Sequence, residues 1–350
     1  MIILVVLTIL IKLFSLFPAV VETYYTNGVY PWIGFVQRLM FGWIPFSIGD
    51  LLYAFAGMWL IFKLIKFVRV IKRKKADKKY LLHSAASTLK VGLYVYVVFN
   101  LLWGLNYNRY GIDYQMKIES TDYDSTDLAE VTRRLAMQMN KLQPASVHTR
   151  NNLYSKQNLF DGAFDAYHNL RKSSSIFSYN YPSIKPSIYS YLGNYMGFTG
   201  YYNPFTGEAQ VNTTVPVFIR PFTSCHEIGH QLGYAKESEA NFAAYLSGTA
   251  SDDPAFQYSI YFEMYAYAAR YLYYSDSIAL KSINAQLSPA VKDDIRTLRN
   301  FLKKYDNPFE TAIDRLYSQY LKANEQPSGK MSYNEVVGML IAYYKKTGKI

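Results

Sequence analysis

Residues 225–241 read CHEIGHQLGYAKESEAN, and this stretch decides how the rest of the chain is interpreted. His226 and His230 are four residues apart, so on a helix both imidazoles lie on one face and can reach a single metal ion. Glu227 follows the first histidine, where its carboxylate can take a proton from a water bound to that metal. The pattern therefore predicts a Zn²⁺ site with two histidine ligands and a neighbouring general base.

The residues downstream offer candidates for a third metal ligand, which a catalytic zinc requires. Gly233 lies three residues past the second histidine, where a glycine can adopt a left-handed conformation and turn the chain sharply. Glu237 then opens an expected second helix and is the favoured ligand, with Asn241 one turn later as a hydrogen-bonding partner for its carboxylate. Glu239 is the alternative third ligand, because a short turn could present either side chain. Glu263, on a later helix, is a more distant alternative.

Three segments near the start of the chain are almost wholly apolar. Each approaches the roughly 20 residues that a helix needs to cross a bilayer. We therefore expect three transmembrane helices, at about residues 1–21, 44–66 and 85–105, within a membrane region of residues 1–106. A cleaved signal peptide is the alternative for the first segment, although that segment lacks a basic start and a clear small-residue cleavage site.

The charge of the chain is concentrated between the second and third apolar segments. Residues 63–79 carry nine Lys or Arg residues against one acid, a net +8 out of the +11 of the whole chain. Short basic loops stay on the cytoplasmic side, so this run is interpreted as a topology signal, and no nucleic acid is expected as a partner. Residues 107–350 would then form an extracytoplasmic domain. In a bacterium this predicts a multi-pass protein of the inner membrane with its catalytic domain on the periplasmic or outer side.

The part after the apolar segments changes character twice. Helical spacing covers residues 125–142 and 158–170, whereas 173–214 is rich in Tyr, Ser, Gly, Asn and Pro with short alternating pieces. Helical patterns return after Pro221 and continue over residues 237–246, 256–274, 291–305, 310–322 and 333–345. The sequence predicts an α+β fold that is mostly helical, with a small sheet. This order suits a metallopeptidase domain of the zincin kind.

Two short segments of this part are expected strands, at residues 187–192 and 209–213. The second one, beside Glu208 and Asn212, lies just before the histidine pair and could bind a substrate backbone by strand addition. The alternative is that it is only a core strand. Such a site also needs a donor for the developing oxyanion, and the tyrosine-rich helix 258–274 offers several candidates.

Four separated segments resemble those of a bacterial membrane-protein family, which is catalogued as domain-of-unknown-function family 3810. They are residues 44–53 (IPFSIGDLLY), 103–109 (WGLNYNR), 204–208 (PFTGE) and 225–241. The resemblance runs over nearly the whole chain, and it implies a membrane-anchored, zincin-like domain.

A looser resemblance concerns the expected third ligand. Residues 237–241 (ESEAN) are similar to the E-x-x-A-D/N element of gluzincins, whose first Glu is a zinc ligand, and this carries over onto Glu237. Gluzincins usually separate their two ligand helices by a longer insertion. Here six residues lie between His230 and Glu237, which is closer to the compact turn of metzincins. This departure leaves the choice of the third ligand open, but it does not change the expectation of two consecutive helices.

Two functions from different classes are compatible with these residues. The leading hypothesis is a zinc-dependent peptidase anchored in a lipid bilayer, which hydrolyses peptide or protein substrates outside the cytoplasm. The alternative is a non-catalytic envelope scaffold or receptor domain that keeps a zincin fold. The intact Glu227 argues against the alternative, because a structural zinc site more often closes its fourth position with another ligand.

The single cysteine, Cys225, excludes an intrachain disulfide and is expected to be a buried structural thiol.

Overall fold

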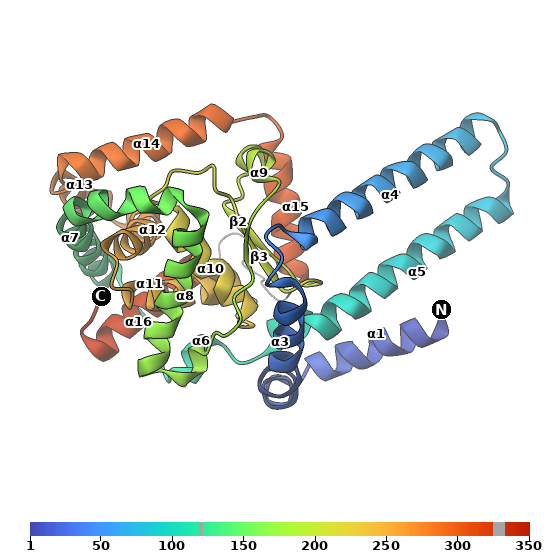
Figure 1. The fold of residues 1–350 in the computed structure, drawn as a ribbon, viewed down its shortest axis with the longest axis horizontal. Coiled ribbons are helices and arrows are strands. Elements are labelled where there is room, and N and C mark those ends of the chain that lie inside the picture. The colour runs from blue at the N-terminus through green and yellow to red at the C-terminus, as the bar shows by residue number, and fades with distance from the viewer. Residues whose placement is uncertain (119–121, 325–332) are drawn as a thin grey trace.

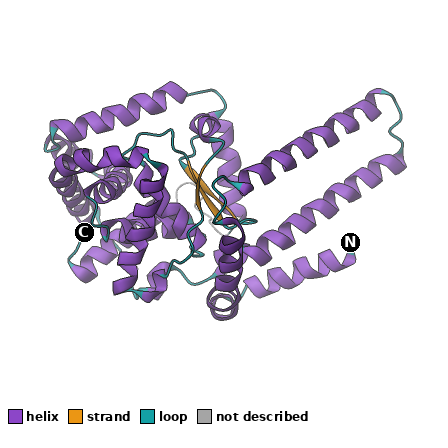
Figure 2. Ribbon diagram, in the orientation of Figure 1, coloured by secondary structure: helices purple, strands orange, loops and turns teal. Residues whose placement is uncertain are grey.

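The computed structural model describes residues 1–118, 122–324 and 333–350. Helices dominate the fold, and a small sheet lies among them (Figure 2), in agreement with the predicted mostly helical class. Two long helices project from the rest of the molecule as a hairpin, and the N-terminal helix lies beside them (Figure 1).

The N-terminal part of the chain is helical almost without interruption. It comprises α1 (Ile2–Ser15), α2 (Pro18–Val20), the π-helix η1 (Val21–Val29), α3 (Tyr30–Phe41), α4 (Ile48–Lys72) and α5 (Lys78–Leu102). Ser47 and Asp77 begin the two long helices, each by accepting a backbone hydrogen bond from the residue three positions on. Each long helix has 25 residues. At 1.5 Å per residue that is about 37 Å, more than the roughly 30 Å hydrocarbon core of a bilayer.

Helices α4 and α5 are each long and apolar enough to cross a membrane. They correspond to the second and third predicted spans, but their bounds differ from those expected. Much of the basic segment 63–79 is helical, because α4 continues to Lys72 and α5 already begins at Lys78. The connection between them is therefore shorter than predicted, and the basic residues gather at the tip of the hairpin.

The first apolar segment does not form the single helix that was predicted over residues 1–21. Helix α1 ends at Ser15, and the chain bends by 99° between Ile2–Ser15 and Pro18–Phe41. Pro18 has no backbone N–H to continue the helical ladder, and its ring would clash with the preceding turn, which explains the break. A third span exists only if this bent pair is counted as one.

The rest of the described chain contains further helices. They are η2 (Gly104–Asn108), α6 (Ile112–Gln115), α7 (Ser125–Arg150), η3 (Asn151–Tyr154), α8 (Lys156–Ser173), η4 (Ser175–Phe177), α9 (Ser190–Met196), α10 (Arg220–Gln231), α11 (Glu237–Thr249), α12 (Pro254–Ser275), α13 (Ser277–Ala285), α14 (Pro289–Tyr305), α15 (Glu310–Ala323) and α16 (Tyr333–Thr347). The sequence predicted α7, α8, α11, α12, α14, α15 and α16 with shorter bounds. Helix α7 begins with a capping box formed by Asp124 and Asp127.

The strand expected over residues 187–192 is wrong. The Ser187 hydroxyl accepts a hydrogen bond from the Tyr189 amide, and the Ser187 carbonyl accepts one from the Ser190 hydroxyl. These local bonds stabilise a turn in place of a strand, and α9 begins at Ser190.

The sheet has three strands in the order β1-β3-β2, with bounds β1 (Ile184–Pro186), β2 (Gly200–Asn203) and β3 (Glu208–Val211). Strand β1 is parallel to β3, and β2 is antiparallel to it. The segment predicted as a possible substrate-binding edge is therefore the central strand, because both of its edges already pair with neighbours. The edge strand that lies near the histidine helix is β2 instead.

Two hydrophobic clusters hold these elements together. The larger one joins buried side chains of α7, α8, α10, α11 and α12. The smaller one joins the membrane region to the turn after α10 through Ile11, Val21, Tyr25, Tyr30, Val97, Trp103, Leu105, Tyr107 and Ala235. The boundary predicted between residues 106 and 107 therefore runs through a shared core.

Candidate metal centre

The two helices that carry the motif, α10 and α11, are joined by a tight turn at Gly233. Its φ of +87° is left-handed, as predicted for a glycine at a helix end. The Tyr234 amide closes the helix with a 3.1 Å hydrogen bond to the Gly229 carbonyl. A Cβ atom at Gly233 would also lie 2.9 Å from the Tyr30 ring, so both backbone conformation and space require glycine here.

The predicted ligands converge at this helix pair. The rings of His226 and His230 have their centroids 4.7 Å apart. His226 Nε2 lies 3.3 Å from Glu237 Oε2, and His230 Nε2 lies 3.7 Å from Glu237 Oε1. Potential ligand atoms of His226, Glu227 and His230 lie within 4.8 Å of one another. Two imidazoles and a carboxylate are a donor set that suits Zn²⁺.

The electrostatics of the group also favour a cation. Burial opposes the charged form of His226, but its hydrogen bond with Glu237 and the charge of Glu227 outweigh this and raise the His226 pKa to about 9. Burial likewise opposes ionisation of Glu237, yet the same hydrogen bond and the His230 ring hold its pKa at about 2. Burial raises the pKa of Glu227 to about 8, and its Oε2 has no hydrogen-bond partner among the described residues. A cation bound here would therefore be stabilised by the nearby carboxylates of Glu227 and Glu237.

The tautomer of His230 is fixed by its neighbour. Its Nδ1 lies 2.8 Å from the carbonyl oxygen of Tyr234, which can only accept a hydrogen bond. Nδ1 therefore carries the proton, and the lone pair of Nε2 points towards Glu237, where a metal would bind.

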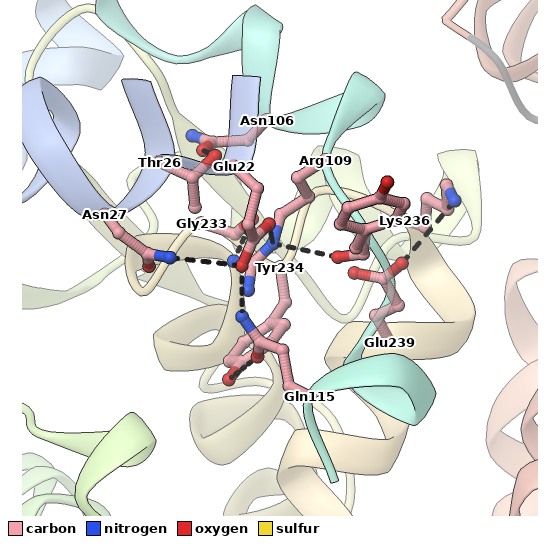
Figure 3. A network of polar contacts seen from close by, with 11 residues as sticks. Glu22, Thr26, Asn27, Asn106, Arg109, Gln115, Gly233, Tyr234, Lys236 and Glu239 are labelled. Atoms are coloured by element: carbon pink, nitrogen blue, oxygen red, sulfur yellow. Dashed lines mark hydrogen bonds and ion pairs between the residues drawn. The ribbon is translucent and has the colours of Figure 1, made fainter. Parts of the chain in front are cut away.

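Glu239, the alternative third ligand, takes part in a different group. Its Oε1 lies 3.6 Å from Lys236 Nζ, and the carboxylate belongs to the polar network in Figure 3. Burial raises its pKa to about 7, against the charges of Lys236 and Arg109. The structure brings Glu237 to the histidines and leaves Glu239 in this network.

Two further residues singled out from the sequence, Asn241 and Glu263, lie near His226. Asn241 lines the same cavity, and its side chain helps to raise the pKa of His226. Its Nδ2 has no hydrogen-bond partner in the described ranges, so the structure does not show the hydrogen bond predicted from Asn241 to Glu237. Glu263 on α12 lies within electrostatic reach of His226, while burial raises the Glu263 pKa to about 7. Cys225 is fully buried, which raises its thiol pKa to about 12, as suits a structural residue.

A residue that the sequence did not single out contacts the candidate ligand. The hydroxyl of Tyr317, on α15, donates a 2.8 Å hydrogen bond to Glu237 Oε1. Tyrosines were expected near the site, but on the helix 258–274, from which Tyr267 lines the same cavity. With 35 tyrosines in the chain, no local pattern distinguishes Tyr317.

Arg109 links the turn that follows the metal helix to Glu22 of the membrane region. Arg109 Nη1 donates a 3.3 Å hydrogen bond to the Gly233 carbonyl, and its Nε lies 3.3 Å from Glu22 Oε2 (Figure 3). The guanidinium also lies over the Tyr234 ring, 4.8 Å from its centroid. Since Tyr234 holds His230, the buried Arg109–Glu22 pair fixes the backbone that orients a candidate ligand.

A cavity of about 690 Å³ opens in front of the candidate ligands. Edge strand β2 forms part of its wall and comes very close to the candidate base. A Cβ atom at Gly200 would lie 2.6 Å from Glu227 Oε1 and 2.7 Å from Thr223 Cγ2. Only glycine therefore allows the strand to run this near to Glu227.

Fold and site together define a mostly helical protein with two helices able to span a membrane and a buried His/Glu group at its cavity. The chain belongs to the family described as "Protein of unknown function (DUF3810)", whose model matches residues 25–341. No curated protein and no solved structure matches the chain.

Proposed function

We propose that this protein is a membrane-anchored, zinc-dependent metallopeptidase with a zincin-like site. One observation carries the proposal: the Nε2 atoms of His226 and His230 meet the carboxylate of Glu237 at the wall of a cavity, beside the buried Oε2 of Glu227, which has no hydrogen-bond partner in the part of the chain that the structure describes. A structural zinc site has no use for such an extra carboxylate, so the arrangement supports catalysis over a purely scaffolding role.

Each residue has a defined role in the proposed hydrolysis. Zinc held by His226, His230 and Glu237 would polarise the scissile carbonyl and lower the pKa of a water molecule. Glu227 accepts the proton of the attacking water and delivers it to the leaving amine nitrogen. Burial favours this transfer, because it raises the Glu227 pKa towards neutrality.

The edge strand β2 is the proposed guide for the substrate backbone. Among the described residues β2 pairs with β3 alone, and its residues Gly200, Tyr201 and Tyr202 line the cavity. An extended peptide that pairs with this edge would pass directly in front of Glu227.

The proposed location is the bacterial inner membrane, with the site on the periplasmic or outer side. The basic tip of the α4–α5 hairpin would remain in the cytoplasm. The site lies with the remainder of the chain, at the opposite end of the hairpin (Figure 1).

The test compares the purified full-length protein with its Glu227→Gln variant. Both should contain zinc by elemental analysis, whereas only the wild type should cleave a degenerate peptide library analysed by mass spectrometry. Glu130→Gln, which alters a half-buried carboxylate on α7, serves as the matched control and should cleave normally. Equal cleavage by wild type and Glu227→Gln would refute the assignment of the base. Zinc without any cleavage would favour a scaffold or receptor.

A further inference from the structure

The cavity in front of the candidate site is shared between the two long helices and the rest of the protein. One part of its wall carries the chemistry, with His226, Glu227 and Glu237. Another part comes from the helices able to span a membrane, with Tyr53 on α4, and Gly92, Val95, Tyr96 and Phe99 on α5. A site meant only for soluble peptides has no need of such a wall.

The cavity extends along the apolar helix for a considerable distance. Gly92 lies ten residues before Leu102, the last residue of α5. At 1.5 Å per residue, the lining reaches about 15 Å from the end of α5 that meets the site, about half of the hydrocarbon thickness.

The space beside this wall is open. An added Cβ atom at Gly92 would meet no atom of the described residues within 4 Å, and Val95 is 47% exposed. At the other end of the hairpin the two helices are in contact, where the rings of Phe67 and Tyr80 stack with centroids 6.2 Å apart. The two helices thus contact each other at the tip of the hairpin, whereas near the site both contribute residues to the wall of the cavity.

We infer that the substrate is the juxtamembrane segment of a membrane-spanning peptide, whose apolar anchor enters the cavity between α4 and α5. This inference rests on the proposed peptidase function and names its substrate class. The scissile segment lies extended against β2, in front of Glu227, and the anchor continues along the face of α5 that carries Gly92 and Val95. Cleavage then takes place at the membrane surface, outside the hydrocarbon core.

The lining favours a polypeptide anchor over an acyl chain. Two tyrosines of the long helices, Tyr53 on α4 and Tyr96 on α5, line the cavity together with apolar residues. Tyrosines combine an apolar ring with a hydroxyl that needs a hydrogen-bond partner. The extended backbone where the scissile segment joins the anchor provides such partners, whereas a hydrocarbon chain has none.

The test uses the full-length, zinc-containing protein in phosphatidylcholine vesicles and three peptide libraries with the same degenerate core. One library ends in a Leu/Ala segment of about 20 residues, one in a polar segment of equal length, and one in a palmitoyl chain. Gly92→Trp should lower cleavage of the Leu/Ala library about tenfold relative to the polar library, because the indole fills the anchor path. Gly57→Trp on α4 is the matched control, since Gly57 also has no atom within 4 Å and does not line the cavity.

The possible results separate this inference from the proposed function. An equal loss on the Leu/Ala and polar libraries, or no loss, overturns the anchor path while hydrolysis stands. A loss confined to the palmitoyl library assigns the path to a lipid-linked substrate and also overturns the inference.

A binding measurement covers the case in which no library is cleaved and the proposed function fails. In Glu227→Gln protein, a benzophenone side chain at Val95 should capture the Leu/Ala library several-fold more than the same probe at Leu64. Leu64 is exposed on α4 and does not line the cavity. Equal capture at both positions overturns the anchor path.

Discussion

The indole Nε1 of Trp103 donates a 3.0 Å hydrogen bond to the carbonyl oxygen of His230. Trp103 directly follows α5, and its ring meets the His230 imidazole edge to face, with centroids 5.9 Å apart. The last carbonyls of a helix have no partners within that helix, so an outside donor stabilises the end of α10. The residue that directly follows a helix able to span the membrane therefore contacts a candidate metal ligand.

Trp103→Phe should weaken zinc binding. The substitution keeps an aromatic ring in the core but removes the N–H that fixes the His230 backbone. Loss of such an outer partner typically lowers metal affinity by about tenfold or more. The affinity can be measured by competition with a chromogenic chelator, with Trp59→Phe on the exposed side of α4 as the matched control. Equal affinities in the two variants would show that the contact does not orient the ligand.

The two neighbouring carboxylates should respond differently to the same change. Glu237→Gln should lose most of its zinc, because Glu237 faces both histidines. Glu239→Gln should keep its zinc and instead lose stability, since it leaves Lys236 without its buried partner. Elemental analysis and thermal unfolding of both proteins test this. Zinc retained in Glu237→Gln and lost in Glu239→Gln would move the third ligand to Glu239.

Zinc binding should strengthen as the pH rises towards 9. Burial opposes protonation of His226, but the hydrogen bond with Glu237 and the charge of Glu227 raise its pKa to about 9. Below that pH the metal-free protein holds a proton on His226 that zinc must displace, because only neutral imidazole is a ligand. The apparent affinity should therefore fall about tenfold for each pH unit between about 9 and 7. Chelator competition at several pH values measures the slope, and a flat profile would mean that His226 is not a ligand.

The helical part of the fold was largely predictable, because local patterns determine it. Residues 125–142 and 158–170 carry regular apolar spacing, and both lie within the longer helices α7 and α8. The glycine turn at Gly233 was also predictable, since a left-handed helix end is a local property of the chain. The break at Pro18 has a local cause too, but the apolar composition around it dominated the prediction.

The parts that were missed depend on contacts between distant segments. Strand β3 was recognised as a strand, but its central position depends on pairing with two other segments, which periodicity does not reveal. The bond between Tyr317 and Glu237 joins residues 80 positions apart, and that between Trp103 and His230 joins residues 127 apart. Spacing within a motif predicts which side chains share a helix face, whereas the residues that support them come from the tertiary fold.

Gly200→Ala should abolish most hydrolysis while the zinc content stays normal. The new methyl group would lie 2.6 Å from Glu227 Oε1 and 3.0 Å from the Gln210 carbonyl, so either the base or the edge strand must move. A displacement of about 1 Å at a reacting group can lower the rate about a hundredfold. Peptide cleavage and elemental analysis measure the two properties. The matched control is Gly338→Ala, whose methyl group would make only an ordinary contact with Tyr123. Zinc lost together with activity would mean that Gly200 supports the fold of the site, whereas full activity would show that β2 does not constrain Glu227.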